Sequence, residues 1–214
     1  VEIVLWPVAL DYKLEDVRAW RPGEVAVAFI NGSVRSSEQE MWVKLLREKC
    51  QLVVAFGSCA HLGGIPGLAN DTSKEAILHN KYLHAVTVEQ HGTLPQRETW
   101  LGEQCLDLPE LWHTVRPLDR VIDVDYYLPG CAPPPNLIAD AVTAILKGQL
   151  PPKGAVLSPA KSLCESCPRN ASKPEEFRLE GFKRVATATP DAEKCFLADG
   201  FVCLGPATRG GCGE

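Results

Sequence analysis

The sequence lacks the features that define several large classes of protein. It carries 22 Lys and Arg against 27 Asp and Glu, a formal net charge of −5, so the basic surplus typical of nucleic-acid binders is missing. No apolar run approaches the roughly 18 residues that a membrane-spanning helix requires. Walker loops, Gly-x-Gly-x-x-Gly loops and the Gly-x-Ser-x-Gly hydrolase motif are absent as well. Nucleic-acid binding, membrane insertion, nucleotide binding and serine hydrolysis therefore have no support.

Cysteine, proline and glycine are abundant, with 9, 17 and 17 residues among 214. Nine cysteines cannot all pair within one chain, and a Cys-x-x-Cys in this composition indicates metal or redox chemistry rather than a disulfide framework. Residues 1–149 hold four of the cysteines and residues 150–214 hold five. We expect a domain boundary there, with residues 148–152 (Gly-Gln-Leu-Pro-Pro) as the linker.

Short apolar runs alternate with helical patterns in the first of these two parts. The runs, typical of strands covered on both faces in a parallel sheet, are residues 1–7, 24–30, 51–56 and 120–128. Helices are predicted for residues 36–49, 73–84 and 136–147, the first beginning with a Ser37–Glu40 capping box. This order predicts an α/β fold with a doubly wound parallel sheet. After Pro151 the signals weaken, and a small loop-rich domain is expected.

Two cysteines follow directly after predicted strands, in loops rich in glycine and proline. Cys59 lies in Gly-Ser-Cys-Ala-His-Leu-Gly-Gly-Ile-Pro-Gly-Leu-Ala-Asn, and Cys131 lies in Pro-Gly-Cys-Ala-Pro-Pro-Pro. Ligands of open α/β sheets collect beyond the carboxyl ends of the strands, so both thiols are candidate ligands at that edge. The alternative is that both are buried small hydrophobic residues, as free cysteines often are.

The C-terminal part contains a denser set of cysteines. Four thiolates that include a Cys-x-x-Cys can enclose either a tetrahedral zinc ion or an iron–sulfur cubane. Spacing alone does not decide between zinc and a cluster. A zinc ribbon usually has a second tight Cys-x-x-Cys pair, whereas the later two cysteines here are eight residues apart, which modestly favours a cluster. A fifth thiol, Cys212, lacks enough partners in this chain. The four candidate ligands are Cys164, Cys167, Cys195 and Cys203.

The remaining cysteines and the histidines give weaker signals. Cys50 at the end of a predicted helix and Cys105 in a predicted polar loop are interpreted as structural. The five histidines show no metal-binding spacing. His61, two residues after Cys59, is expected to have a supporting or surface role.

Taken together, these motifs resemble the small subunit of a nickel–iron hydrogenase, nearest to the cytoplasmic methyl-viologen-reducing type associated with heterodisulfide reductase. The resemblance runs over nearly the whole chain. It is carried by the two loops above and by Cys-Glu-Ser-Cys-Pro-Arg and Cys-Leu-Gly-Pro-Ala-Thr-Arg-Gly-Gly-Cys-Gly. It implies a flavodoxin-like domain at 1–149 and a cysteine-rich, iron–sulfur-binding domain at 150–214.

The resemblance also implies three [4Fe–4S] clusters in the complete subunit. Cys59 and Cys131 would be proximal ligands, and Cys212 would be the first medial ligand. The distal cluster would be held by Cys164, Cys167, Cys195 and Cys203. Many relatives have a histidine at the first of these positions, and an all-thiolate shell should lower the potential.

The sequence departs from the family pattern at both ends. The proximal Cys-x-x-Cys belongs upstream of Val1, and the other medial cysteines belong beyond Glu214. We therefore expect both chain ends to be missing from this sequence, which leaves the proximal and medial ligand sets incomplete.

The resemblance predicts a relay subunit with no catalytic residue of its own. Electrons would pass from a nickel–iron centre on a large subunit through the clusters to a further iron–sulfur or flavin subunit. No membrane span or nucleic acid is expected, and the predicted location is the cytoplasm. The alternatives are the homologous subunit of complex I or an energy-converting complex, which generally lacks the cysteine-rich tail, and a redox-silent zinc-stabilised scaffold.

Overall fold

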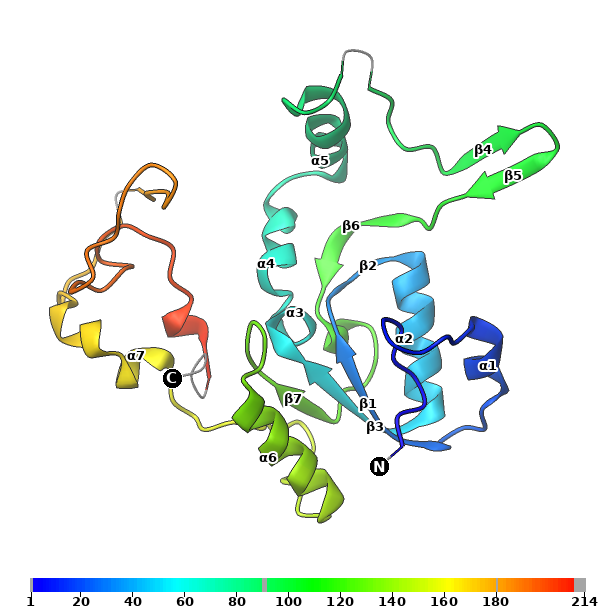
Figure 1. Cartoon of the computed structure of the whole chain (residues 1–214), viewed down its shortest axis with the longest axis horizontal. Helices are drawn as coiled ribbons and strands as arrows, with labels where there is room; N and C mark the ends of the chain where they lie inside the picture. Colours follow the sequence, from blue (N-terminus) through cyan, green and yellow to red (C-terminus); the bar gives the residue numbers. More distant parts are fainter. Residues whose placement is uncertain (1, 90–91, 180, 210–214) are drawn as a thin grey trace. The chain divides into compact units, whose positions relative to one another are not determined.

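Three short strands form the central sheet of the structure, a computed structural model that describes residues 2–89, 92–179 and 181–209 (Figure 1). The strand order is β1–β3–β7, and β1 and β3 are parallel, in register from Val25 opposite Cys50 to Asn31 opposite Phe56. Val53, Val54 and Ala55 in the middle strand have no exposed surface, as expected for a strand covered on both faces. The predicted α/β class with a parallel sheet is confirmed. The strands are β1 (Val25–Asn31), β3 (Cys50–Phe56) and β7 (Tyr126–Leu128).

The elements divide into two compact units. The first comprises Val1–Tyr127 with Pro152–Ala155, and the second comprises Leu128–Pro151 with Val156–Glu214. The predicted assignment of cluster-bearing domains to 1–149 and 150–214 stays a prediction. Within the described ranges, no helix is long and apolar enough to cross a membrane.

In the first unit, the elements around the sheet are short. The sheet's core includes Ile30, Val43 and Leu118, which pack with the buried part of β3. The elements are α1 (Leu14–Ala19), β2 (Val34–Ser36), α2 (Ser37–Lys49), α3 (Gly57–Leu62), α4 (Gly64–Gly67), η1 (Leu68–Asp71), α5 (Lys74–His79), η2 (a π-helix, Asn80–His84), β4 (Glu98–Leu101), β5 (Gln104–Asp107), β6 (Leu111–Arg116) and η3 (Leu118–Arg120).

The start of α2 differs by one residue from the prediction. The cap is Ser36, whose Oγ accepts a hydrogen bond from the Gln39 amide at 3.2 Å while Gln39 Oε1 accepts one from the Ser36 amide at 3.1 Å. Ser37 instead makes two hydrogen bonds of 2.9 Å with Glu110. The Ser37 amide donates to the Glu110 carbonyl oxygen, and Ser37 Oγ accepts from the Glu110 amide. The predicted Ser37–Glu40 capping box is therefore wrong, because the strand that precedes α2 extends to residue 36.

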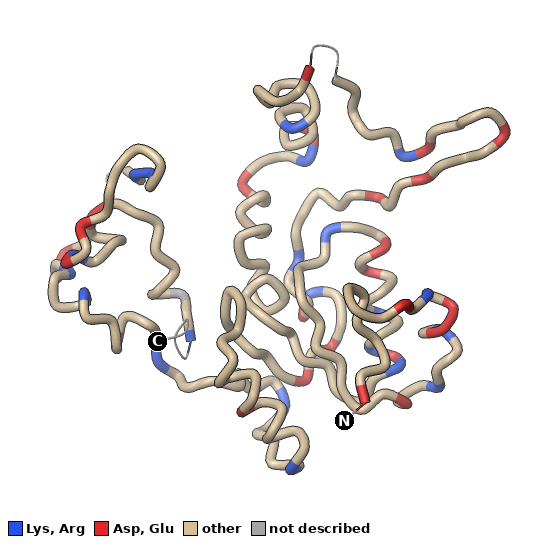
Figure 2. The backbone as a smooth tube through the Cα atoms, viewed as in Figure 1, with Lys and Arg blue, Asp and Glu red and all other residues tan. Residues whose placement is uncertain are grey.

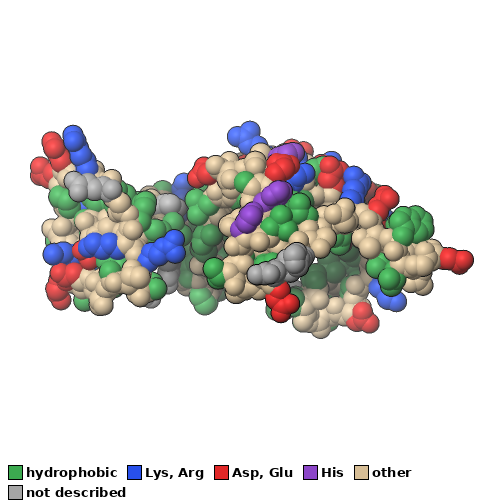
Figure 3. All heavy atoms as spheres, turned by 90° about the horizontal axis from the view of Figure 1, so that it is seen from above, with side chains coloured by type: hydrophobic (Ala, Val, Ile, Leu, Met, Phe, Trp, Pro, Cys, Tyr) green, Lys and Arg blue, Asp and Glu red, His purple; other side chains and the backbone are tan. Residues whose placement is uncertain are grey.

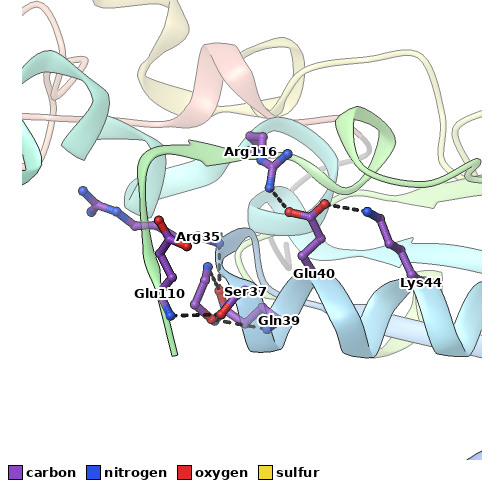
Figure 4. Close-up of polar contacts among 8 residues, drawn as sticks. Arg35, Ser37, Gln39, Glu40, Lys44, Glu110 and Arg116 are labelled. Carbon is purple, nitrogen blue, oxygen red and sulfur yellow. Dashed lines mark hydrogen bonds and ion pairs between the residues drawn. The ribbon is translucent and has the colours of Figure 1, made fainter. Parts of the chain in front are cut away.

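Glu40 connects α2 to β6 (Figure 4). Its carboxylate pairs with Lys44, one turn further along α2, at 2.6 Å, and with Arg116 of β6 at 2.5 Å. These two contacts hold the pKa of Glu40 below its usual value, with the hydrogen bond from Lys44 as the largest cause. Strands β2 and β6 pair antiparallel beside this helix, with a register irregularity between Val34 and Ser36.

Elements of the second unit are fewer relative to its length. Its longest helix, α6 (Pro135–Leu146), begins with a proline, which tolerates the first helical turn because its missing N–H has no partner there. The others are α7 (Leu163–Ser166), η4 (Pro168–Ser172) and η5 (Gly205–Ala207). Among the described residues of this unit, one isolated bridge joins Lys183 to Phe201. Loops dominate the described residues after Pro151.

Candidate functional site

Cys59 lies on the short helix α3, which begins at Gly57 immediately after β3 ends at Phe56. The prediction of a loop at this position was wrong, because the strand passes directly into a helical turn. Gly63, in the left-handed conformation, ends that turn by donating its N–H to the Cys59 carbonyl oxygen at 3.0 Å. The thiol is half-buried at the carboxyl end of the strand, which is where ligands of such sheets bind.

Gly64 packs its backbone directly against Cys59. A Cβ atom at this position would lie 2.9 Å from both the Cα and the Sγ of Cys59, and Gly64 has a φ of +55°. Glycine is therefore required by both conformation and space. The Gly-Gly pair in the motif fixes the position of the cysteine backbone.

His61 lies on the same helical turn as Cys59. Its ring stacks against Tyr127 with the centroids 4.5 Å apart and the planes tilted by 35°. The Tyr127 hydroxyl donates a hydrogen bond to Asp119 Oδ2 at 3.2 Å, and burial together with this carboxylate raises the pKa of Tyr127. His61 thus packs against Tyr127 from the helix that also carries Cys59, and its supporting role stays a prediction.

Cys131 follows Gly130, three residues after β7 ends, and its side chain is exposed. Gly130 has a φ of +133°, and a Cβ there would come within 2.5 Å of Pro133 Cα. Only glycine fits this tight bend. Cys59 and Cys131 belong to different units, so their predicted shared cluster stays a prediction.

Four cysteines of the second unit line one cavity of about 130 Å³. All four are free and half-buried. Two come from the α7–η4 turn, and two come from the segment before η5. The cavity therefore brings together the four C-terminal residues predicted as ligands: Cys164, Cys167, Cys195 and Cys203.

Backbone groups around η5 hold two of these sulfurs close to Gly205. A Cβ on Gly205 would lie 3.4 Å from Cys203 Sγ and 3.5 Å from Cys164 Sγ. The Gly205 amide donates to Cys203 Sγ at 3.4 Å. Thr208 joins this turn to α7, because its Oγ1 accepts from the Leu163 amide at 2.9 Å and donates to the Gly205 carbonyl oxygen at 2.7 Å.

The segment that carries Cys195 is anchored by its own hydrogen bonds. The Cys195 amide donates to Ser172 Oγ at 2.8 Å, and its carbonyl oxygen accepts from the Asp199 amide at 2.9 Å. The Asp199 carboxylate pairs with Lys183 at 3.0 Å, and this hydrogen bond is the largest cause of the lowered pKa of Asp199. The backbone of Cys195 is therefore held on one side by Ser172 and on the other by Asp199.

Two basic side chains border the cavity, and the sequence analysis did not identify them. Arg169 lies over the Phe196 ring, 4.5 Å from its centroid, and its Nε donates to the Ala192 carbonyl oxygen at 2.7 Å. Lys173 also lines the cavity. Both residues follow the Cys-x-x-Cys within six residues. Basic residues shortly after this motif were therefore the sequence signal that could have identified them. Positive charge here would offset the negative charge of four ligating thiolates.

Other candidates are placed outside the cavity. Cys50 is buried at the start of β3, and burial raises the pKa of its thiol. Cys105 lies in strand β5, so the predicted polar loop was wrong. Cys212, the predicted medial ligand, lies outside the described residues. Among the described residues, no three His, Cys, Asp or Glu side chains are placed to hold a single metal ion.

Comparison with known proteins identifies the class of this fold and site. The model of the family described as NADH ubiquinone oxidoreductase, 20 Kd subunit, matches residues 3–145. The chain belongs to this family. Within it, the extensive matches are hydrogenase subunits, so the chain is a small subunit of the hydrogenase type, and the resemblance predicted from its motifs is confirmed.

Relatives from other organisms match all of this chain. It is 42% identical to the iron-sulfur subunit of the F420-non-reducing hydrogenase of Archaeoglobus profundus, covering 68% of that protein. It is 38% identical to a vhu subunit of the F420-non-reducing hydrogenase of Methanocaldococcus jannaschii, covering 66%. The chain thus spans about two thirds of the length of these curated relatives.

A solved structure shares the fold of the chain. A chain in the crystal structure of NAD+-reducing [NiFe]-hydrogenase in the H2-reduced state superposes with a TM-score of 0.53 at 31% identity. The match covers 60% of this chain and 68% of that one.

Proposed function

We propose that this chain is the electron-transfer subunit of a nickel–iron hydrogenase and that its second unit holds a [4Fe–4S] cluster. The observation that carries the proposal is the cavity lined by four cysteines from two separate segments. The name of the Archaeoglobus relative, an iron-sulfur subunit, supports it. When bound, such a cluster supplies reversible one-electron storage.

We favour a polynuclear cluster over a single zinc ion chiefly because the Archaeoglobus relative is named an iron-sulfur subunit. A zinc site requires all four sulfurs at about 2.3 Å from one metal. Among the described side chains, no such group is assembled, yet four cysteines border a common volume of about 130 Å³. Cys164, Cys167, Cys195 and Cys203 would each bind one corner of the cluster. A zinc-stabilised scaffold is the less favoured interpretation.

The chain's residues around the cavity have distinct tasks in this proposal. The Gly205 amide donates a hydrogen bond to the Cys203 sulfur and so helps to hold it at the cavity. Phe196 and Arg169 line the cavity, with the guanidinium over the ring, and would limit the access of water to a bound cluster. Burial and amide hydrogen bonds to sulfur are the means by which proteins set cluster potentials.

Cys59 and Cys131 are proposed as part of a proximal ligand set, and Cys212 as part of a medial one. For Cys59 the support is its place at the carboxyl end of β3, fixed by Gly64. The proposed partners are the large subunit that carries the nickel–iron centre and an electron-accepting iron–sulfur or flavin subunit. The proposed location is the cytoplasm, where ligating thiols stay reduced.

The alternative is the homologous subunit of complex I or an energy-converting complex. The family model ends at residue 145, before the four-cysteine cavity begins. The hydrogenase relatives, in contrast, align along the entire chain. The C-terminal unit therefore favours the hydrogenase assignment.

Metal analysis of the anaerobically purified complex tests the proposal. We expect acid-labile sulfide close to equimolar with iron on this chain, and nickel only on its partner. Cys164→Ser should remove or convert one cluster, a loss of up to about four irons per chain, whereas Cys105→Ser on the exposed strand β5 should remove none. Zinc without sulfide, or unchanged iron and electron paramagnetic resonance spectra in Cys164→Ser, would contradict the proposed cluster.

A further inference from the structure

The hairpin β4–β5 exposes apolar side chains on both of its faces. Every residue in its two strands is exposed, and Trp100, Leu101 and Leu106 retain 66%, 69% and 55% of their accessible surface. Residues opposite each other in an antiparallel ladder share a face, and successive residues alternate faces. Trp100 is opposite Cys105 on one face, and Leu106 is opposite Thr99 on the other.

The hairpin projects from the first unit as an arm, without a helix or sheet laid against it in Figure 1. In the space-filling view, hydrophobic side chains are visible at the right-hand end, where the hairpin lies, with both acidic and basic side chains near them (Figure 3). A two-stranded hairpin by itself is marginally stable in water, and large exposed apolar groups mark interaction sites. A flat partner would cover only one face, whereas a cleft would enclose both.

The charge of the arm restricts what can enclose it. Glu98, Glu103 and Asp107 are acidic, and residues 98–108 contain no Lys or Arg. Arg97 at the base pairs with Glu110 at 3.6 Å, which leaves the projecting part negative (Figure 2). A second copy of the arm or an anionic lipid surface would bring like charges together. A cleft rimmed by Lys and Arg complements the arm.

We propose that β4–β5 is a docking arm that inserts into an apolar cleft, rimmed by Lys and Arg, on another protein subunit of the complex. Trp100 on one face and Leu106 with Leu101 on the other would fill the cleft, and the three carboxylates would meet its rim. The inference rests on the proposed function only in taking the hydrogenase complex as the source of the partner.

Cys105 provides a direct probe of this contact, because it is exposed on the same face as Trp100. In the intact complex, maleimide labelling of Cys105 should be at least about tenfold slower than in the separated chain, since a docked hairpin excludes reagent. Val86→Cys supplies the control, because Val86 is fully exposed elsewhere in the first unit. Its labelling should be equally fast in both samples. Equal labelling of Cys105 in both samples would overturn the docking arm.

Matched variants test the apolar and the electrostatic parts separately. Trp100→Glu and Leu106→Glu should each accelerate dissociation of the complex roughly tenfold or more, as expected for apolar anchors, while Val86→Glu should not. Glu103→Lys should accelerate dissociation mainly at low salt and flatten its salt dependence. Melting temperatures of the separated chains should stay similar, because all these side chains are exposed.

The outcomes are distinguishable from a failure of the proposed function. A complex that forms with iron and sulfide, yet dissociates unchanged in Trp100→Glu and Leu106→Glu, would overturn only the docking arm. Dimerisation of the separated chain through the hairpin, or its binding to phosphatidylserine vesicles, would assign the arm to another occupant. Loss of the clusters with normal docking would contradict the redox proposal alone.

Discussion

At the scale of single residues, the geometry around Cys59 gives the first prediction. Gly64→Ala would place a Cβ within 2.9 Å of Cys59 Cα and Sγ at a φ of +55°. Because both contacts are with the same cysteine, the helix turn that carries it must move. We expect a loss of stability of roughly 1–3 kcal/mol and faster alkylation of Cys59, measured by denaturation and by mass spectrometry.

Gly32→Ala is the matched control for backbone strain. Gly32 also has a positive φ, +92°, but a Cβ there meets nothing within 4 Å. It should lose stability without changing the alkylation rate of Cys59. Equal alkylation rates in Gly64→Ala and the unmodified chain would mean that Gly64 does not position this thiol.

The basic residues at the four-cysteine cavity give the second prediction. Arg169→Gln and Lys173→Gln each remove a positive charge at the border of the four-cysteine cavity. Since adding an electron to the cluster increases its negative charge, losing a nearby cation should shift its midpoint potential to more negative values. Redox titration followed by electron paramagnetic resonance measures this shift. Arg169→Gln should have the larger effect, because Arg169 is half-buried and Lys173 is exposed.

Arg178→Gln controls for the general loss of charge. Arg178 is exposed and does not line the cavity, so solvent screening should leave the potential nearly unchanged. A shift in Arg178→Gln as large as in Arg169→Gln would show that the cavity residues have no special role.

At the scale of elements, the sequence predicted the parts of the fold that follow from hydrophobic runs. Strands β1 and β3 and helices α2 and α6 lie within about two residues of their predicted positions. Residues 2–7 form no strand, because an apolar run does not specify a pairing partner. The β4–β5 hairpin was not predicted. Each face of its two strands carries both polar and apolar side chains, so its sequence resembles that of a loop.

The candidate site was predictable to the same limited extent. The pattern of cysteines identified Cys164, Cys167, Cys195 and Cys203 as candidate ligands, and the family resemblance assigned them to a distal [4Fe–4S] cluster. The Gly205 amide, Ser172 and Arg169 were not identified, because their roles depend on where the loops fold. Spacing alone does not place residues across a loop-rich segment.

Asp125 joins three elements and gives the third prediction. Its nearly buried carboxylate accepts hydrogen bonds from Arg47 of α2 at 2.6 Å and from the Val53 amide of β3 at 2.8 Å. Lys153 pairs with it from the outside at 2.5 Å. Burial by itself raises the pKa of Asp125, but the hydrogen bonds from Lys153, Arg47 and Val53 outweigh it and hold that pKa below its ordinary value.

Asp125→Asn should therefore cost roughly 3 kcal/mol in the free energy of unfolding at neutral pH, because Arg47 loses its buried partner. A carboxylate with a lowered folded-state pKa stabilises the fold above its unfolded-state pKa of about 3.9 and loses that contribution as pH falls through the folded-state value. The difference between the variant and the unmodified chain should shrink in that acidic range. Chemical denaturation from neutral to acidic pH measures it.

Lys153→Met is the control for this prediction. Its side chain is largely exposed, so its ion pair should contribute only about 0.5 kcal/mol. If Lys153→Met were as destabilising as Asp125→Asn, the outer pair rather than the buried Arg47 contact would hold these elements together. A pH-independent effect of Asp125→Asn would show that the charge on the carboxylate is not what matters.

At the scale of the whole molecule, the two parts of the chain are stabilised differently. The sheet unit buries a continuous apolar core that includes Val43, Val53 and Leu118. Among the described residues of 156–209, Phe201 is the only buried hydrophobic side chain. The remaining structure of this segment consists of short helices, one isolated bridge and hydrogen bonds between loops. Apolar burial alone is too limited to order this segment, so a bound cluster should supply much of its folding free energy.

The fourth prediction follows from that difference. Removing iron and sulfide with ferricyanide and a chelator should open the segment 163–205 while the central sheet stays folded. Hydrogen exchange should then accelerate at the amides of Cys195, Phe201 and Gly205, whose hydrogen bonds depend on the folded loops. Amides of β1 and β3 should keep their protection, because their parallel ladder and buried core do not involve the cavity. Unchanged exchange throughout 163–205 would mean that this segment folds without the cluster, and simultaneous loss of protection in β1 and β3 would mean that both parts unfold as one cooperative structure.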